Sequence, residues 1–176
     1  MTKQYLFAGF GGQGILFAGK LLAYKGLMAD SNVSWLPSYG PEMRGGTASC
    51  GVVISNHQIA TPIVIHPDVL IAMNLPSLDR YEDDVQSGGT IYVDSSLIER
   101  KVKRTDVTVH YIPATLLAAQ NGLDGLANMI IMGKILKDEG QISDESVEKA
   151  LGKCISARHA DMLKFNRDAL LLGSEY

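Results

Sequence analysis

Apolar residues follow two patterns along the chain, short continuous runs and longer stretches with three- or four-residue spacing. The first short run, residues 4–8, has the length and composition of a β-strand. In the stretch that follows, apolar side chains recur at helical spacing, at Ile15, Leu16, Ala18, Leu21, Leu22 and Leu27. A helix that lies on a sheet shows this spacing. The chain is therefore predicted to begin with a strand, a turn and a helix, as a Rossmann-like fold does.

Further strands are predicted from later apolar runs, which cover residues 33–36, 48–54, 59–64, 69–73, 90–94 and 107–112. The turn signal Asn56-His57-Gln58 separates the run 48–54 from the run 59–64, so we expect these two to pair as a hairpin. The run 69–73 is apolar throughout, which is typical of a strand covered on both faces. A hairpin next to covered strands predicts a mixed sheet.

Helices are predicted between and after these strands. One begins at Leu75, with Pro76 in its first turn, where proline is well tolerated. The chain beyond Pro113 is predicted to be mostly helical, with one helix over 126–136, one capped by Ser143 with Ile142 and Val147 as a hydrophobic staple, and one around 162–171 that ends near Gly173. The sequence thus predicts a single domain over residues 1–176, a three-layer α/β/α fold with a central mixed sheet and a helical C-terminal part.

Composition limits the function classes. A chain of 176 residues with 46% hydrophobic residues can bury one core. The net charge of -3 gives no electrostatic reason to expect nucleic acid or an anionic membrane as a partner. The basic segment 100–104 is interpreted as a solvated loop or a partner surface. No apolar run approaches the roughly 18 residues of a membrane helix, so no membrane association is expected.

The cysteine content argues against a metal cluster in this chain. Cys50 and Cys154 are the only two cysteines, whereas an iron–sulfur cluster takes about four thiolates. The sequence shows no signal peptide, so we expect a cytoplasmic protein whose thiols stay reduced. Both thiols are expected to be buried and to act as small apolar side chains.

The first candidate site is the glycine-rich motif at residues 9–14, Gly-Phe-Gly-Gly-Gln-Gly. It lies between the first strand and the first helix, where free amides and the helix dipole favour an anion such as phosphate. Alternatively, the glycines only permit close packing of strand and helix. A dinucleotide site would also need an acidic residue about twenty positions later, at the tip of the second strand. Asp30 precedes the predicted strand 33–36 instead, which argues against NAD.

The second candidate site is the segment 37–46, Pro-Ser-Tyr-Gly-Pro-Glu-Met-Arg-Gly-Gly. Two prolines and three glycines predict a loop of fixed shape. The loop carries Tyr39, Glu42 and Arg44, and a guanidinium can bind a phosphate or carboxylate through two parallel hydrogen bonds. Arg44 can equally pair with Glu42 or with a neighbouring subunit. The segment is therefore a candidate for a binding site, a subunit contact or a rigid structural loop.

Other polar residues receive structural interpretations. The histidines show no spacing that suggests a catalytic triad, and His57 and His66 are expected at the surface. Asp94 follows a strand and is interpreted as a helix cap. Asn128-Met129 together with Gly133 indicates tight packing of a helix.

The two motifs resemble those of one protein family, the gamma subunits of 2-oxoacid:ferredoxin (or acceptor) oxidoreductases. The family pattern runs Gly-x-Gly-Gly-Gln-Gly and then Ser-Tyr-Gly-Pro-Glu-x-Arg-Gly-Gly. This sequence matches these and later family motifs at residues 9–14, 38–46, 68–71, 88–94, 113–115 and 128–129. The resemblance covers nearly the whole chain, and the first two motifs together are specific.

The resemblance implies a subunit of a complex that converts a 2-oxoacid, coenzyme A and oxidised ferredoxin into acyl-CoA, CO2 and reduced ferredoxin. Alpha and beta subunits would hold thiamine diphosphate and magnesium, and iron–sulfur clusters on beta or on a ferredoxin-like delta chain would carry electrons. This chain would bind no cofactor alone, contribute no catalytic residue and be inactive in isolation. Pyruvate, 2-oxoglutarate, branched-chain and aryl 2-oxoacids all fit as substrates.

The resemblance also implies where this chain meets coenzyme A. In the family this domain helps to form the coenzyme A side of the active-site cleft. The implied contact residues lie in the two glycine loops and are Gly11, Gly12, Gln13, Gly14, Ser38, Tyr39, Gly40, Glu42, Arg44 and Gly45. Two other functions stay open at this stage: a stand-alone Rossmann-type nucleotide-binding oxidoreductase, and an assembly subunit whose loops contact no ligand.

Overall fold

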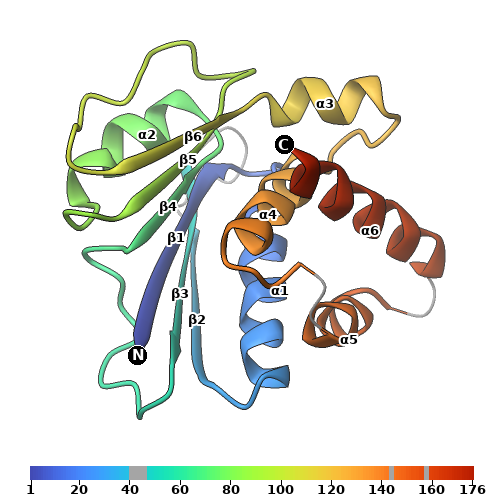
Figure 1. Ribbon diagram of the computed structural model, residues 1–176, viewed down its shortest axis with the longest axis horizontal. Helices are drawn as coiled ribbons and strands as arrows, with labels where there is room; N and C mark the ends of the chain where they lie inside the picture. Colours follow the sequence, from blue (N-terminus) through green and yellow to red (C-terminus); the bar gives the residue numbers. More distant parts are fainter. Residues whose placement is uncertain (40–46, 143–144, 157–158) are drawn as a thin grey trace.

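The computed structural model describes residues 1–39, 47–142, 145–156 and 159–176. Six strands among these residues form one sheet in the order β2-β3-β1-β4-β5-β6 (Figure 1). The strands are β1 (Thr2–Phe10), β2 (Asn32–Tyr39), β3 (Thr47–Ser55), β4 (Val69–Ala72), β5 (Thr90–Asp94) and β6 (Thr108–Ile112). Strands β1, β4, β5 and β6 are parallel, and β3 pairs antiparallel with both β1 and β2. The predicted mixed sheet is confirmed.

The predicted hairpin is wrong. Residues 59–64 join no strand, and the two partners of β3 are β1 and β2 instead. Pro62 has no N–H to donate to a ladder, which disfavours a strand at this point. The segment packs against the sheet and does not extend it. Val64 lies against Gly51 of β3, because a Cβ added to Gly51 would be 3.1 Å from Val64 Cγ2.

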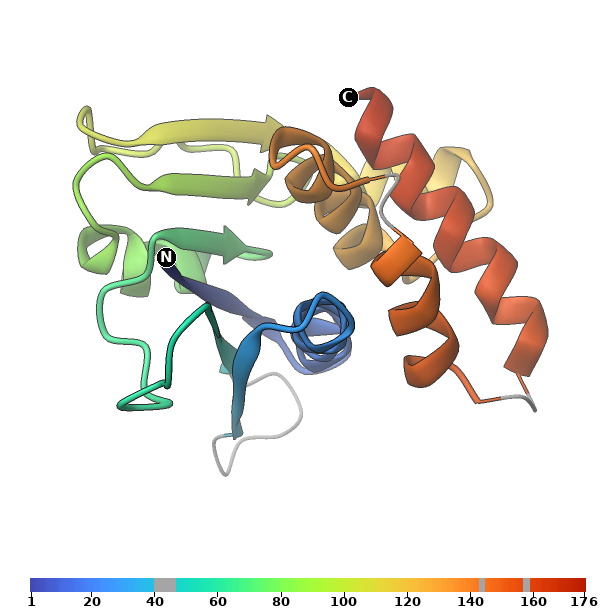
Figure 2. The ribbon, with the colours of Figure 1, turned by 60° about the horizontal axis from the view of Figure 1, so that its bottom comes forward.

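Helices cover both faces of the sheet. They are α1 (Ile15–Met28), α2 (Leu75–Tyr81), the 3-10 turn η1 (Glu82–Asp84), α3 (Ala114–Gln120), α4 (Ala127–Asp138), α5 (Glu145–Cys154) and α6 (Ala160–Glu175). Helix α2 covers one face, α1 and α4 lie on the other, and α5 and α6 pack outside them (Figures 1 and 2). The three-layer prediction is therefore confirmed. Ser143, the predicted cap of α5, lies outside the described residues.

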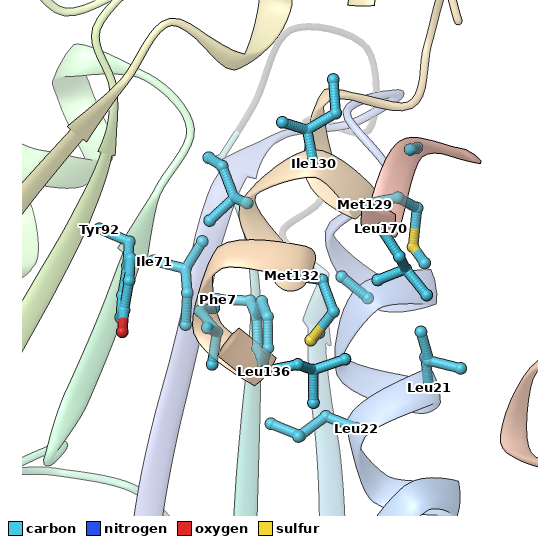
Figure 3. Packing of buried hydrophobic residues seen from close by; sticks show 14 of the residues in the cluster. Phe7, Leu21, Leu22, Ile71, Tyr92, Met129, Ile130, Met132, Leu136 and Leu170 are labelled. Atoms are coloured by element: carbon cyan, nitrogen blue, oxygen red, sulfur yellow. The ribbon is translucent and has the colours of Figure 1, made fainter. Parts of the chain in front are cut away.

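Two apolar clusters hold the layers together. Successive residues of a strand point to opposite faces, so neighbouring apolar residues serve different clusters. The smaller cluster lies under α2 and includes Leu6, Leu70, Leu78 and Ile91. The larger one joins the sheet to the other helices, and Figure 3 shows its members Phe7, Ile71, Tyr92, Met129, Met132 and Leu136. Buried apolar area of this kind is the main stabilising contribution to the fold.

Helices α4 and α6 cross at two glycines. A Cβ added to Gly133 would overlap the carbonyl oxygen of Leu170, and one added to Gly173 would overlap that of Ile130. The two backbones therefore touch without intervening side chains. This confirms the tight packing predicted at Gly133. The role of Gly173 differs from the prediction, because α6 continues to Glu175 and the glycine lies in the crossing rather than at a helix end.

The basic segment 100–104 is tied to the domain by ion pairs. The Arg100 guanidinium donates to both carboxylate oxygens of Glu82, at 2.8 and 3.2 Å. Arg104 pairs with Asp106 and also donates to the main-chain oxygen of Val85. The two arginines thus fasten the segment to η1, while Lys101 and Lys103 are exposed to solvent. The segment is a loop, and its interpretation as a partner surface stays a prediction.

Candidate functional site

The first glycine-rich motif and the described start of the second lie at one edge of the sheet. Phe10, the last residue of β1, is paired with Thr47, and Tyr39, the last residue of β2, is paired with Ala48. Strands β1 and β2 therefore end at the same edge of the sheet, one on each side of the start of β3, and β4, β5 and β6 also end at this edge. In open α/β sheets this carboxyl edge is where ligands bind.

The structure places part of the predicted contact set. Gly11 to Gly14 form the loop between β1 and α1, and Ser38 is exposed at the end of β2. Tyr39 is placed by its backbone at the same edge. Four other predicted residues, Gly40, Glu42, Arg44 and Gly45, lie outside the described residues.

The side chain of Gln13 faces the protein. Its Oε1 accepts a hydrogen bond from the main-chain N–H of Phe10 at 2.7 Å, and its Nε2 donates to the main-chain oxygen of Met73 at 2.9 Å. Asn74 donates to the same Oε1 at 3.3 Å. The amide therefore ties the glycine loop to the end of β4. A ligand at this loop would meet mainly backbone amides.

Those amides belong to the first turn of α1. The N–H of Ala18 donates to the oxygen of Gly14, which is the first bond of the helical ladder. The N–H groups of Ile15, Leu16 and Phe17 precede that ladder, as at any helix N-terminus. Together with the helix dipole they favour an anion.

Gly14 joins the loop to the helix in a conformation that favours glycine. Its φ is 69°, in the left-handed region. Its main-chain oxygen accepts a hydrogen bond from Asn128 Nδ2 at 3.0 Å, and a Cβ at this position would overlap that amide. Glycine is therefore needed here for two separate reasons, backbone conformation and the close approach of α4.

Substitution Gly14→Ala is expected to lower the free energy of unfolding by about 2–4 kcal/mol, since it combines backbone strain with loss of the Asn128 contact. Gly140→Ala is a matched control, because Gly140 has φ 68° and open space around it. The control should show only the strain, about 1–2 kcal/mol. Urea unfolding of both variants measures the difference, and equal losses would contradict the role assigned to Asn128.

Three hollows surround the glycine loop. One of about 230 Å³ is lined by Gly11, Gly12 and Ala48, and one of about 250 Å³ by Gly12, Gln13 and Thr115. A third, of about 370 Å³, reaches Gly14 from the side of α6. The loop is thus the common wall of the hollows at this edge.

Asp94 is the last residue of β5 and lies at the same edge of the sheet as the glycine loop 11–14. Its buried carboxylate accepts hydrogen bonds from the hydroxyl of Thr115 at 2.6 Å and from the N–H groups of Thr115 and Ser96. The interpretation of Asp94 as the cap of a helix that follows it is wrong, because no helix begins there and the next helix, α3, starts at Ala114 after its N-cap residue Pro113. The carboxylate instead accepts from Thr115 in the first turn of α3. The Asp94 carboxylate is therefore hydrogen-bonded to groups of the protein itself.

Asp30 is not placed where the acidic residue of a dinucleotide-binding site would lie. Asp30 lies in the turn that ends α1, with φ 55°, and is not at the tip of a strand. The strand after it, β2, is an edge strand that runs antiparallel to β3. The sheet therefore departs from the consecutive parallel strands that a dinucleotide site requires.

The two thiols differ in their surroundings. Cys50 is buried in the core as predicted, whereas Cys154 is only partly buried and lines the third hollow. Burial raises the pKa of the Cys50 thiol to about 12 and that of the Cys154 thiol to about 11. Both are free thiols in the structure.

The described residues contain neither a candidate metal site nor a candidate membrane-spanning helix. Within residues 1–39, 47–142, 145–156 and 159–176, no three His, Cys, Asp or Glu side chains are placed to share a metal ion. In the same part of the chain, no helix has the length and apolar character needed to cross a membrane.

Fold and site together define an α/β domain with a mixed sheet, whose carboxyl edge presents a glycine loop, a helix N-terminus and the ends of a second glycine-rich loop. The chain belongs to the pyruvate ferredoxin/flavodoxin oxidoreductase family, which it matches over residues 4–176. Within that family it is of the gamma-subunit type, as the sequence resemblance predicted.

Relatives and a solved structure agree with this assignment. Ketoisovalerate oxidoreductase subunit VorA of Methanothermobacter thermautotrophicus is 39% identical over 170 residues, which are 96% of this chain and 35% of that protein. The 2-oxoglutarate synthase subunit KorC of Methanocaldococcus jannaschii is 38% identical over 154 residues, 86% of this chain and 82% of that one. The solved gamma subunit of the keto/oxoacid ferredoxin oxidoreductase from Geobacter sulfurreducens covers 98% of this chain and is covered to 96%, with a TM-score of 0.81 and 28% identity.

The relatives differ in length. This chain spans about a third of the VorA protein but most of KorC and of the Geobacter sulfurreducens subunit. The same domain thus occurs within a longer polypeptide and as a gamma chain of similar size.

Proposed function

We propose that this chain acts as the gamma subunit of a thiamine-dependent 2-oxoacid:ferredoxin oxidoreductase complex, and that its carboxyl sheet edge forms the coenzyme A side of the active-site cleft. The complex would convert a 2-oxoacid, coenzyme A and oxidised ferredoxin into acyl-CoA, CO2 and reduced ferredoxin. The observation that supports the proposal is the pairing of Phe10 with Thr47 and of Tyr39 with Ala48, because it brings the first family motif and the described start of the second to one edge of the sheet.

We propose a role for each subunit from the cofactor that it would bind. Alpha and beta subunits would bind thiamine diphosphate and Mg²⁺, and thiamine diphosphate supplies the decarboxylation chemistry there. Iron–sulfur clusters on beta, or on a ferredoxin-like delta chain, would pass the released electron pair to ferredoxin. This chain would bind and orient coenzyme A and would be inactive alone. We place the complex in the reducing cytoplasm.

Residues of this chain fit the anionic part of coenzyme A. The N–H groups of Ile15, Leu16 and Phe17 open a helix of 14 residues and favour a phosphate. Gly12 has φ 98° and open space beside it, so the loop offers a surface without side chains. We propose that Arg44 completes the phosphate contact through its guanidinium.

Substitution Arg44→Ala is expected to raise the apparent KM for coenzyme A about tenfold or more in the assembled complex, because a charge-assisted hydrogen bond contributes about 1.5–3 kcal/mol. The KM for the 2-oxoacid should stay unchanged. Arg167→Ala is a suitable control, since Arg167 lies on α6 and pairs with Glu148. An unchanged KM for coenzyme A in an intact Arg44→Ala complex would contradict the proposed contact and favour a purely structural loop.

A further inference from the structure

The turn that follows α3 contains the sequence's only Asn-Gly pair, Asn121-Gly122. Both residues are exposed to solvent. Asparagine is a chemically labile residue, because the main-chain nitrogen of the next residue can attack its side-chain carbonyl carbon. A glycine in the next position favours this attack, since it has no β-carbon to obstruct the approach of the nitrogen.

The attacking group in this turn is free. The N–H of Leu123 donates to the oxygen of Ala118 at 2.9 Å, which is the outer hydrogen bond of a Schellman motif. The inner bond of that motif would run from Gly122 to the oxygen of Ala119, and it is not formed although the structure describes both residues. Among the described residues, no group accepts a hydrogen bond from the N–H of Gly122.

The side chain of Asn121 is held by one weak tether. Its Nδ2 donates to the oxygen of Leu117 at 2.8 Å, in the last turn of α3. This helix has only seven residues, and the ends of short helices open readily. Gly122 has φ 66° and open space beside it, so the turn can change its backbone angles without a clash. The carbonyl carbon of Asn121 can then reach the nitrogen of Gly122.

Asn56 is a matched comparison within the same chain. It is also exposed, but the N–H of the next residue, His57, donates to Ser55 Oγ at 3.1 Å. The side chain of His57 also obstructs the approach of its nitrogen. Exposure, a glycine neighbour and a free attacking N–H therefore occur together at Asn121 and not at Asn56.

We propose that Asn121 is a site of spontaneous deamidation. The nitrogen of Gly122 forms a bond to Cγ of Asn121, the bond from Cγ to Nδ2 breaks, and ammonia leaves with the proton of the Gly122 nitrogen. Water then opens the resulting succinimide ring at either of its carbonyl groups. The product is an aspartate, or an isoaspartate in which the main chain runs through the former side chain. The reaction needs no oxidant or reductant.

Deamidation places a carboxylate at an unfavourable position. An aspartate has no N–H to donate to the oxygen of Leu117, and its charge lies at the negative end of the α3 dipole. Asn121 also lines a hollow of about 320 Å³ together with Asp168 and Glu175 of α6. The product therefore loses the hydrogen bond that ends α3 and gains repulsion from two carboxylates.

The reaction is measured on the purified full chain during incubation at mildly alkaline pH, with digestion and mass spectrometry of timed samples. Replacement of the amide –NH2 by –OH raises the peptide mass, fragmentation locates the residue, and isoaspartyl methyltransferase labels the isoaspartate. Deamidation is expected to be about tenfold or more faster at Asn121 than at Asn56. Equal rates at the two residues, or reaction of Asn121 only in the urea-unfolded chain, would overturn the proposal.

Three variants separate the chemistry from its effect on the fold. Asn121→Gln keeps an amide but would have to close a larger ring, so the modification at this position should disappear. Gly122→Ala should slow it about tenfold, because the new β-carbon obstructs the nitrogen. Asn121→Asp reproduces the aspartate product and should lower Tm by about 2–4 °C, and by less at high salt. An unchanged rate in Gly122→Ala would overturn the proposed attack.

Discussion

Replacing Gly133 by alanine is expected to destabilise the protein by about 3 kcal/mol or more, and Gly173→Ala should have a similar effect. In each case the new methyl group would overlap a carbonyl oxygen of the facing helix, Leu170 or Ile130. Backbone atoms cannot change rotamer, so α4 and α6 must separate along their crossing. The apolar contacts of Leu170 with the larger cluster would then loosen. For a chain of this size, Tm should fall by roughly 6–12 °C.

Gly152→Ala is the matched control for both glycines. Gly152 also lies inside a helix, α5, but has no atom within contact distance of an added Cβ. Alanine there should be neutral or should stabilise the protein by up to about 1 kcal/mol through its helix propensity. Thermal unfolding of the three variants measures the contrast. A Tm loss for Gly152→Ala as large as for Gly133→Ala would show that the crossing is not the cause.

The second large effect is expected at Glu82. Its side chain is 2% exposed and accepts two hydrogen bonds from Arg100 and one from the main-chain N–H of Lys103. Glu82→Gln removes the charge and leaves the guanidinium without its buried partner, which should cost about 3 kcal/mol. The segment 100–104 should then become accessible to trypsin, because Arg100 and Arg104 anchor it to η1.

Asp79→Asn tests whether the loss of stability at Glu82 comes from the burial of its ion pair or from the removal of a charge beside Arg100. Asp79 also pairs with Arg100, but its side chain is 51% exposed. Its substitution should therefore change the free energy of unfolding by less than about 1 kcal/mol. Urea unfolding gives both values, and limited trypsin digestion gives the state of the segment. Equal losses at Asp79 and Glu82 would contradict the importance of the buried pair.

The sequence predicted where strands and helices lie along the chain better than it predicted which strands pair with each other. Continuous apolar runs located β1 and the later parallel strands, which are covered on both faces, and apolar residues at helical spacing located α1. The partner of β3 depends on which distant edge it meets, and no local pattern carries that information. Residues 59–64 were therefore placed in a hairpin, although they cover Gly51 from outside the sheet.

The candidate site was also predicted only in part from the sequence. Two glycine-rich segments far apart in the chain predicted a site, and the structure brings the ends of both to one edge. The inward position of Gln13 was not foreseen, since it depends on a carbonyl of Met73 that only the folded sheet places there.

The central claim is tested most directly by recovering this chain with its partners from native extract under anaerobic conditions. The account predicts that thiamine-binding alpha and beta subunits accompany it, and that the recovered complex reduces ferredoxin or viologen only when a 2-oxoacid and coenzyme A are both present. A panel of pyruvate, 2-oxoglutarate, branched-chain and aryl 2-oxoacids then names the substrate. Recovery of a monodisperse chain without partners or coenzyme A-dependent activity would contradict the account.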